Sequence, residues 1–246
     1  MTVFQRLILR CVAAVMLVGL TACATGPDAH PQDPLEPWNR GVYRFNDVLD
    51  TNVVKPVAET YQEVTPDPVR KGVSNFFGNI RDVWSSVNAA LQLRPQEALE
   101  NLFRVGVNTT LGLGGVLDVA TEMGIPRTRM DFGQTLGRWG VPSGPYLVLP
   151  LLGPSSVRDA TGTGIQFRLN EYTNFDDDHV QNSLTALEVV DTRAGLLRAG
   201  TLLNEAAIDK YSFMRDFYLQ RRQNQIEDLI EQGIGVRDRA PAPATP

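Results

Sequence analysis

The chain has 246 residues, and its 28 aspartates and glutamates outnumber its 23 lysines and arginines, which gives a formal net charge of −5. This acidic excess argues against a nucleic-acid-binding protein, for which a basic face is expected. The sequence holds only two histidines and two cysteines, which argues against a histidine-based metal site and against a disulfide framework.

Residues 1–22 have the layout of a secretory signal peptide. Two arginines stand in the first ten residues, an apolar run covers residues 11–20, and the small residue Ala22 precedes Cys23. Ten residues make about 15 Å of helix, which is half of a bilayer's hydrocarbon core, so the segment does not span a membrane. The sequence Leu-Thr-Ala-Cys resembles a bacterial lipobox, in which the cysteine is acylated and becomes the new N-terminus. An ordinary signal peptide with a chance cysteine is the alternative.

The expected mature chain begins at Cys23, with a polar tether over residues 23–32. It keeps no other cysteine, because Cys11 leaves with the signal peptide, so its body is expected to have no disulfide. We expect a single helical domain over residues 33–235 and a disordered tail, rich in proline and alanine, over residues 236–246. No stretch of this body reaches 18 consecutive apolar residues, so no transmembrane helix is predicted.

The first half of the body shows the apolar spacing of amphipathic helices. Asp33 is the expected N-cap of the first helix, whose apolar stripe continues towards Pro56, where we expect a break or kink. Two further helices are predicted, over residues 69–91 and from Pro95 onwards. The glycine-rich stretch 108–115 then predicts a turn in which backbone segments approach closely.

Residues 131–154 change character, because their many glycines and prolines exclude a long helix. We expect two short strands, 135–139 and 146–149, joined by residues 141–145 as a hairpin. The apolar run 146–152 has two interpretations that the sequence leaves open: a segment in contact with lipid, or a hairpin buried in the core.

The C-terminal third returns to helical spacing. Apolar residues recur at intervals of three and four from residue 184 to residue 197, and a further helix with several apolar residues is predicted from about residue 205 to residue 232. The sequence therefore predicts a mainly α fold with one irregular insertion rich in glycine and proline.

No group of residues makes a convincing catalytic or metal site. Ser155, His179 and Asp159 can be written as a triad, but one histidine can be combined with almost any serine and carboxylate. The alternative is that Arg158 and Asp159 pair after a loop. The acidic residues 176–178 lack the spacing of an EF-hand and are interpreted as a solvated loop or a helix N-terminus. We therefore predict that the protein is not an enzyme.

Several blocks of sequence, spread in order over about residues 33–222, closely resemble the MlaA (VacJ) lipoproteins of Gram-negative bacteria. The blocks are DPLEPWNRGVYRFNDVLD, VVKPVAETY, PVRKGVSNFFGNI, NTTLGLGGVLDVA, DFGQTLGRWGVPSGPYLVLPLLGPSSVRD and YSFMRDFYLQR. The resemblance implies a ring-shaped, mostly helical platform sunk in the inner, periplasmic leaflet of the outer membrane and anchored by the acylated Cys23. The residue after it, Ala24, is compatible with outer-membrane sorting.

The resemblance also implies a function in lipid transport. Phospholipids would leave the outer leaflet through a central amphipathic channel and pass to a periplasmic lipid carrier, MlaC, in a retrograde pathway that maintains lipid asymmetry. A trimeric outer-membrane porin of the OmpC/OmpF type is the implied partner, and no cofactor is implied. A non-transporting adaptor lipoprotein bound to a porin is the alternative function, and a lipid hydrolase is a third.

The resemblance implies particular residues along the lipid path. Candidates on the first helix, in the glycine-rich hairpin and after it are Phe45, Asn46, Gly137, Gly140, Gly144, Arg158 and Asp159. The glycines are expected to let the hairpin bend, and the other residues to lie near the channel. A plainer interpretation stays open, in which Asn46 caps a turn and Arg158 and Asp159 simply pair.

Overall fold

The computed structural model describes residues 30–169 and 178–237 of the chain, and this part is mainly helical, as predicted. Its elements are α2 (Glu36–Leu49), a π-helical segment (Asp50–Val54), α3 (Lys55–Val64), α4 (Asp67–Leu91), α5 (Pro95–Thr110), α6 (Val119–Glu122), α7 (Phe132–Arg138), β1 (Tyr146–Leu149), β2 (Gly153–Ser156), α8 (Val157–Leu169), α9 (Asp178–Gly195), α10 (Leu197–Ala206) and α11 (Lys210–Arg237). The predicted signal peptide, Cys23, Asp176, Asp177 and the tail from residue 238 lie outside the described residues. Within the described ranges, no helix has the length and apolar character needed to cross a membrane.

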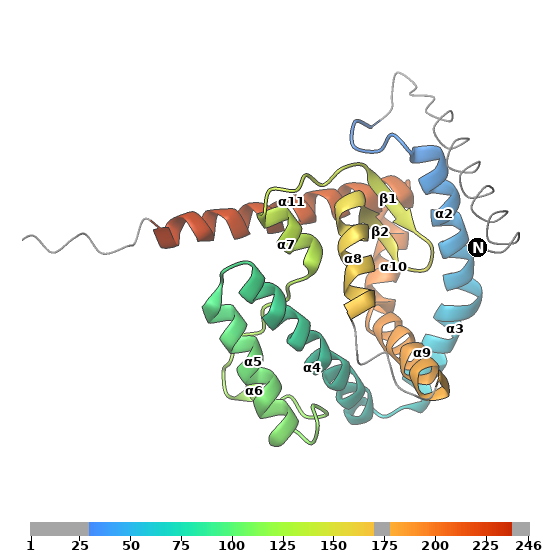
Figure 1. Cartoon of the computed structure of the whole chain (residues 1–246). Coiled ribbons are helices and arrows are strands. Elements are labelled where there is room, and N and C mark those ends of the chain that lie inside the picture. The colour runs from blue at the N-terminus through green and yellow to red at the C-terminus, as the bar shows by residue number, and fades with distance from the viewer. Residues whose placement is uncertain (1–29, 170–177, 238–246) are drawn as a thin grey trace, which may run out of the picture.

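The helices follow a roughly closed outline rather than stacked layers (Figure 1). α2 and α3 succeed one another along one side, α4 and α5 form a helical hairpin on the other, and the long α11 crosses one end. α9 packs against α3 and α4, while α8 packs against α7 and both strands. Segments far apart in the sequence therefore meet around α8, in the middle of this arrangement.

The first helix begins later than predicted, and its regular α-helical path is interrupted just before Pro56. It begins at Glu36, because the carboxylate of Asp33 turns into the interior, where it accepts a hydrogen bond from the side chain of Asn39 instead of capping the helix. Pro56 does not end the helical run. The π-helical segment Asp50–Val54 leads into α3, and Pro56 lies in the first turn of α3, where a missing N–H costs little.

The turn after α5 confirms the predicted close approach of backbone segments. A Cβ atom added to Gly112 would lie 2.2 Å from the carbonyl oxygen of Leu117 and 2.4 Å from that of Asn108. Only glycine can occupy such a position without moving the backbone. The preceding helices α4 and α5 match the predicted segments at residues 69–91 and from Pro95.

The predicted strand at residues 135–139 is wrong, because this stretch is part of the helix α7. Asp131 and Gln134 form a capping box, in which each side chain bonds the backbone N–H of the other residue. The strand predicted at residues 146–149 is confirmed as β1, but its antiparallel partner is β2, with Tyr146 opposite Ser156. The hairpin is therefore displaced towards the C-terminus, and α8 begins directly after it.

The last helix begins later and runs further than predicted. α10 ends at Ala206, and α11 extends from Lys210 to Arg237. Asp209 marks the start of α11, because its carboxylate accepts hydrogen bonds from the backbone N–H of Tyr211 and from the hydroxyl group of Ser212.

The interior is rich in polar side chains. Among the described residues, the buried positions hold more polar and charged residues than apolar ones. The largest fully buried side chain is that of Arg104, which joins α5 to α4 and α6. Its guanidinium group donates hydrogen bonds to Asp82, Asp118, Thr121 and the carbonyl oxygen of Ile125. Many large apolar side chains are exposed instead, including Trp38 and Leu93. The usual arrangement of a water-soluble domain is thus partly reversed.

Candidate functional site

A polar cavity of about 410 Å³ lies where α4, α7, α8 and α11 meet near β2. Its volume is within the range of about 300–1,000 Å³ that is typical of small-molecule pockets. Most of the lining residues are polar or charged. The charged ones are arginines from α4, from the segment before α7 and from α11, and aspartates from the N-termini of α7 and α8. The lining is thus assembled from segments that are distant in the sequence.

Asp159, one of the residues singled out from the sequence, lies in the wall of this cavity and is almost fully buried. One carboxylate oxygen accepts a hydrogen bond from Arg158 at 2.9 Å; the other accepts bonds from the hydroxyl group of Tyr218 at 2.5 Å and from Arg222 at 2.7 Å. Burial acts to raise the pKa of Asp159, but the hydrogen bonds and the charge of Arg222 outweigh it, so this pKa is lowered. Asp159 is therefore ionised at neutral pH.

Arg222 fastens α11 to the start of both α7 and α8. Its two terminal nitrogens bond both carboxylate oxygens of Asp131, at 2.6 and 2.7 Å, while Nε bonds Asp159. Burial acts to lower the pKa of Arg222, but its bonds and charge interactions with both aspartates raise it. A Cβ atom on Gly133 would lie 2.4 Å from Asp159 Oδ1 and 2.7 Å from Arg222 Nη2, so glycine is needed beside this cluster.

The cavity carries an excess of positive charge, because four arginines and only two aspartates line it. Arg222 pairs with both aspartates, Arg158 pairs with Asp159 as well, and Arg81 pairs with Glu188 at 2.7 Å. Arg129 and Arg221 are exposed, and neither forms an ion pair with any residue that the structure describes. Two guanidinium groups therefore remain available in the lining.

The plainer interpretation of Arg158 and Asp159 matches the geometry, because the two side chains pair directly. Asp159 also lies in the cavity wall. The ion pair with Arg158 is therefore compatible with a position at the polar site. The hydroxyl group of Ser155 donates to the carbonyl oxygen of Ser156 at 3.3 Å, and the carboxylate of Asp159 is held by arginines and Tyr218. This arrangement does not favour a hydrolase triad.

Asn46 lies away from the cavity and holds the turn of the β-hairpin. Its side-chain amide donates to the carbonyl oxygen of Leu149 at 2.9 Å, and its side-chain oxygen accepts from the backbone N–H of Leu151 at 2.9 Å. Asn46 therefore binds a turn, as the plainer interpretation of this residue expected. Its neighbour Phe45 is 56% exposed on α2 and does not line the polar cavity.

The three predicted hinge glycines do not share one segment. Gly137 is inside α7, so its expected place in the hairpin is wrong; a Cβ atom there would lie 2.6 Å from Ile226 Cδ1 and 2.9 Å from Arg158 Nη1. A side chain at this position would displace the ends of the Ile226 and Arg158 side chains. Gly140 and Gly144 lie between α7 and β1 with φ of +90° and +69°, values that favour glycine.

One part of the apolar run 146–152 is buried in the core and another part is exposed, so each of the two interpretations made from the sequence describes a part of it. Tyr146 and Val148 point into the core and are almost completely buried, next to Tyr211. Leu151 and Leu152, in the turn, are exposed instead. The strand is therefore a core element, and only the turn presents apolar side chains outwards.

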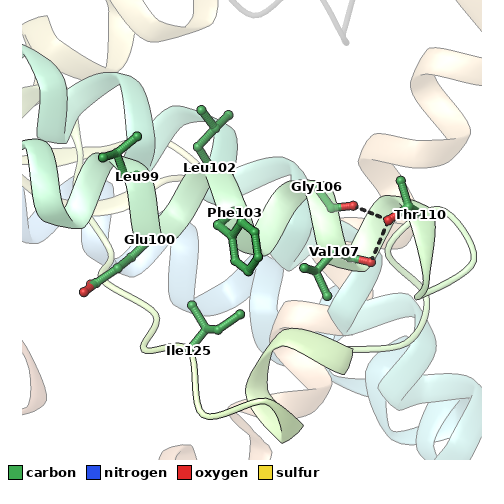
Figure 2. A pocket seen from close by; sticks show the side chains of 8 residues that line it. All are labelled: Leu99, Glu100, Leu102, Phe103, Gly106, Val107, Thr110 and Ile125. Atoms are coloured by element: carbon green, nitrogen blue, oxygen red, sulfur yellow. Dashed lines mark hydrogen bonds between the residues drawn. The ribbon is translucent and has the colours of Figure 1, made fainter.

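A second cavity, of about 680 Å³, is a shallow apolar groove along α5 (Figure 2). Leu99, Leu102 and Phe103 line it and are each more than half exposed, while Ile125 forms the opposite side. Such a row of exposed apolar residues on a helix is typical of a surface that meets lipid or another protein. Among the described residues, no cluster of histidine, cysteine, aspartate and glutamate could hold a metal ion.

Taken together, the fold and the site define an amphipathic helical protein with apolar outer faces and a polar, arginine-lined interior cavity. The family of MlaA lipoproteins matches residues 31–225 of the chain, which is most of its length. The chain therefore belongs to the MlaA lipoprotein family.

Comparison with individual proteins agrees with this family. The chain is 36% identical over 225 residues to the intermembrane phospholipid transport system lipoprotein MlaA of Escherichia coli K12, covering 89% of this chain and 85% of that protein. It is 30% identical over 237 residues to the protein of the same description from Haemophilus influenzae, covering 92% of this chain and 94% of the relative. A solved structure from work on the maintenance of bacterial outer membrane lipid asymmetry matches with a TM-score of 0.69 and 35% identity, covering 79% of this chain and 98% of that one.

Sequence reasoning found Asp159 and its partner Arg158 but missed the other two residues that hold the carboxylate, Tyr218 and Arg222. Tyr218 lies within a block that carries the family resemblance, yet nothing in its local spacing marks it as a cavity residue. Arg222 bonds partners 63 and 91 positions away, so no local pattern reveals it. The spacing of Asp131 and Gln134 was the one local signal available, because it is that of a capping box.

Proposed function

We propose that this protein is the outer-membrane lipoprotein of an intermembrane phospholipid transport system. It removes phospholipids from the outer leaflet of the outer membrane and passes them to a periplasmic carrier of the MlaC type, which maintains lipid asymmetry. Family membership and the phospholipid transport function of the relatives from Escherichia coli and Haemophilus influenzae support this proposal. Acylated Cys23 anchors the protein in the periplasmic leaflet, beside a trimeric porin.

The observation that carries the proposal is the combination of a polar cavity with apolar outer faces. A phospholipid needs a path that solvates its head group while its acyl chains stay in apolar surroundings, because leaving either group in the wrong medium is costly. The cavity near Asp159 supplies the polar part, and exposed apolar helices such as α5 supply the contact with the leaflet. We place Arg158 and Asp159 along the lipid path. Asn46, Gly140 and Gly144 set the position of the hairpin beside it.

The proposal is tested by measuring phospholipid in the outer leaflet of cells with and without the gene. A membrane-impermeant, amine-reactive reagent labels exposed phosphatidylethanolamine. Deletion should raise the labelling, the wild-type gene should restore it, and a Cys23→Ala gene should not, although immunoblots detect the variant protein. Labelling that does not change on deletion contradicts the proposal.

A second experiment separates transport from the adaptor role. The purified protein and its porin are reconstituted into donor vesicles that contain a fluorescent phospholipid. An excess of the periplasmic carrier is added outside the vesicles as the acceptor. Transport predicts that labelled lipid reaches the carrier only when this protein is present. An adaptor would bind the porin and leave the lipid in the vesicles.

A further inference from the structure

Arg129 and Arg221 are the two charged groups of the polar cavity whose charge nothing described in the structure neutralises. They come from different segments, one before α7 and one in α11, and line the same 410 Å³ cavity. The two aspartates of the lining are already taken by Arg222, through three hydrogen bonds of 2.6–2.7 Å. They are therefore not available to pair with Arg129 or Arg221.

The chemistry of these two groups indicates a phosphate ligand. A guanidinium group is always charged, is weakly hydrated, and presents a planar set of donors that matches two oxygens of a phosphate. A carboxylate ligand would offer the same two oxygens, but a cavity of about 410 Å³ holds a larger group, and the lining also includes the apolar side chains of Trp84 and Met130. A phosphodiester attached to a glycerol backbone satisfies both the charge and the mixed lining.

We propose that Arg129 and Arg221 bind the phosphodiester group of a phospholipid in this cavity. This inference rests on the proposed transport function and names the part of the substrate that is recognised. Recognition of the phosphodiester, which all common phospholipids share, lets the cavity accept head groups that differ beyond the phosphate. The fixed cluster of Arg222, Asp131 and Asp159 holds the wall, while Arg129 and Arg221 contact the ligand.

The test is a binding titration of the mature lipoprotein in a maltoside detergent, which contains no phosphate. Three probes are compared by calorimetry below their micelle concentrations: dihexanoyl phosphatidylglycerol, dihexanoyl phosphatidylethanolamine and dihexanoylglycerol, which lacks phosphate. Inorganic phosphate is the fourth probe and distinguishes a lipid site from a free-phosphate site. The wild-type protein should bind both phospholipids with similar affinity, bind inorganic phosphate more weakly, and not bind dihexanoylglycerol.

Variants then assign the binding to the two arginines. The double variant Arg129→Gln/Arg221→Gln should bind both phospholipids at least about tenfold more weakly than the wild type, because it loses the charge-assisted hydrogen bonds to the phosphate. The double variant Arg129→Lys/Arg221→Lys should recover part of the loss. The matched control is Arg44→Gln/Arg198→Gln, which removes the same charge from exposed positions outside the cavity and should bind like the wild type. Thermal unfolding of each variant confirms that it is folded.

The outcomes distinguish this inference from the transport proposal. Unchanged phospholipid binding by the Arg129→Gln/Arg221→Gln variant overturns the inference, even if deletion of the gene still raises outer-leaflet phospholipid. Equal losses in the cavity variant and in the control also overturn it, because they indicate a general effect of charge. Tighter binding of inorganic phosphate than of either lipid overturns the assignment to a lipid phosphodiester. Outer-leaflet phospholipid that does not depend on the gene contradicts the transport proposal, whatever the titrations show.

Discussion

Replacing Asn39 by alanine should destabilise the protein, because this side chain joins α2 to the core strand β1. Asn39 is fully buried, and its amide donates to Asp33 at 2.8 Å and to the carbonyl oxygen of Tyr146 at 3.0 Å, while its oxygen accepts from the backbone N–H of Val148 at 2.9 Å. Asn39→Ala leaves two buried backbone groups without a partner, at a cost of about 1–3 kcal/mol each. With partial relief by entering water, we expect a loss of about 3 kcal/mol in the free energy of unfolding.

The assay is thermal unfolding of the purified mature protein, followed by circular dichroism at 222 nm. A loss of about 3 kcal/mol corresponds to a fall in Tm of about 6–12 °C for a body of this size. The matched control is Asn52→Ala, which removes an exposed bond from the amide to the carbonyl oxygen of Val48 one turn earlier and should change the free energy of unfolding by less than about 0.5 kcal/mol. Equal melting temperatures for Asn39→Ala and the wild type would refute the reasoning.

Two further predictions concern a backbone contact and a buried carboxylate. Gly112→Ala should lower the free energy of unfolding by at least about 2 kcal/mol in the same assay, because its Cβ atom would collide with two carbonyl oxygens, while Gly106→Ala, which meets nothing within 4 Å, should be neutral or stabilising. The lowered pKa of Asp159 means that its stabilising bonds are fully present above its unfolded-state pKa of about 4 and are lost as the pH falls through its lower folded-state pKa. The difference in Tm between wild type and Asp159→Asn should therefore be largest near pH 7 and shrink below pH 4; a constant difference from pH 7 to pH 3 would contradict this account.

The parts of the fold that the sequence predicts are those fixed by local chemistry. Pro95 starts a helix because its missing N–H is unused in a first turn, and Gly112 marks a turn because no side chain has room there. The strand predicted at residues 135–139 is wrong, because this stretch lies in the short helix α7. The glycines and prolines of residues 131–154 exclude a long helix but allow a short one, and the capping box of Asp131 and Gln134 starts that short helix.

The parts that could not be predicted are those that depend on contacts between distant segments. β2 has the sequence Gly-Pro-Ser-Ser, which carries no strand pattern, and it becomes a strand only because β1 offers a partner. The cavity has the same origin, because Arg222 meets Asp159 and Asp131 only once α11 lies across α7 and α8. Asp159 was found through the family resemblance and not through a local signal.

The buried polar side chains and the exposed apolar side chains suit different surroundings, a polar interior and an apolar exterior. Arg104 can be buried because four partners satisfy its donors, and those bonds do not depend on water outside the protein. Side chains such as Leu102 and Phe103 lose little by facing acyl chains, whereas in water they would expose a continuous apolar surface. A phospholipid places the same demand on its surroundings, with a charged head group and apolar chains. A polar cavity together with exposed apolar helix faces therefore matches both the leaflet and the phospholipid substrate that we propose for this protein.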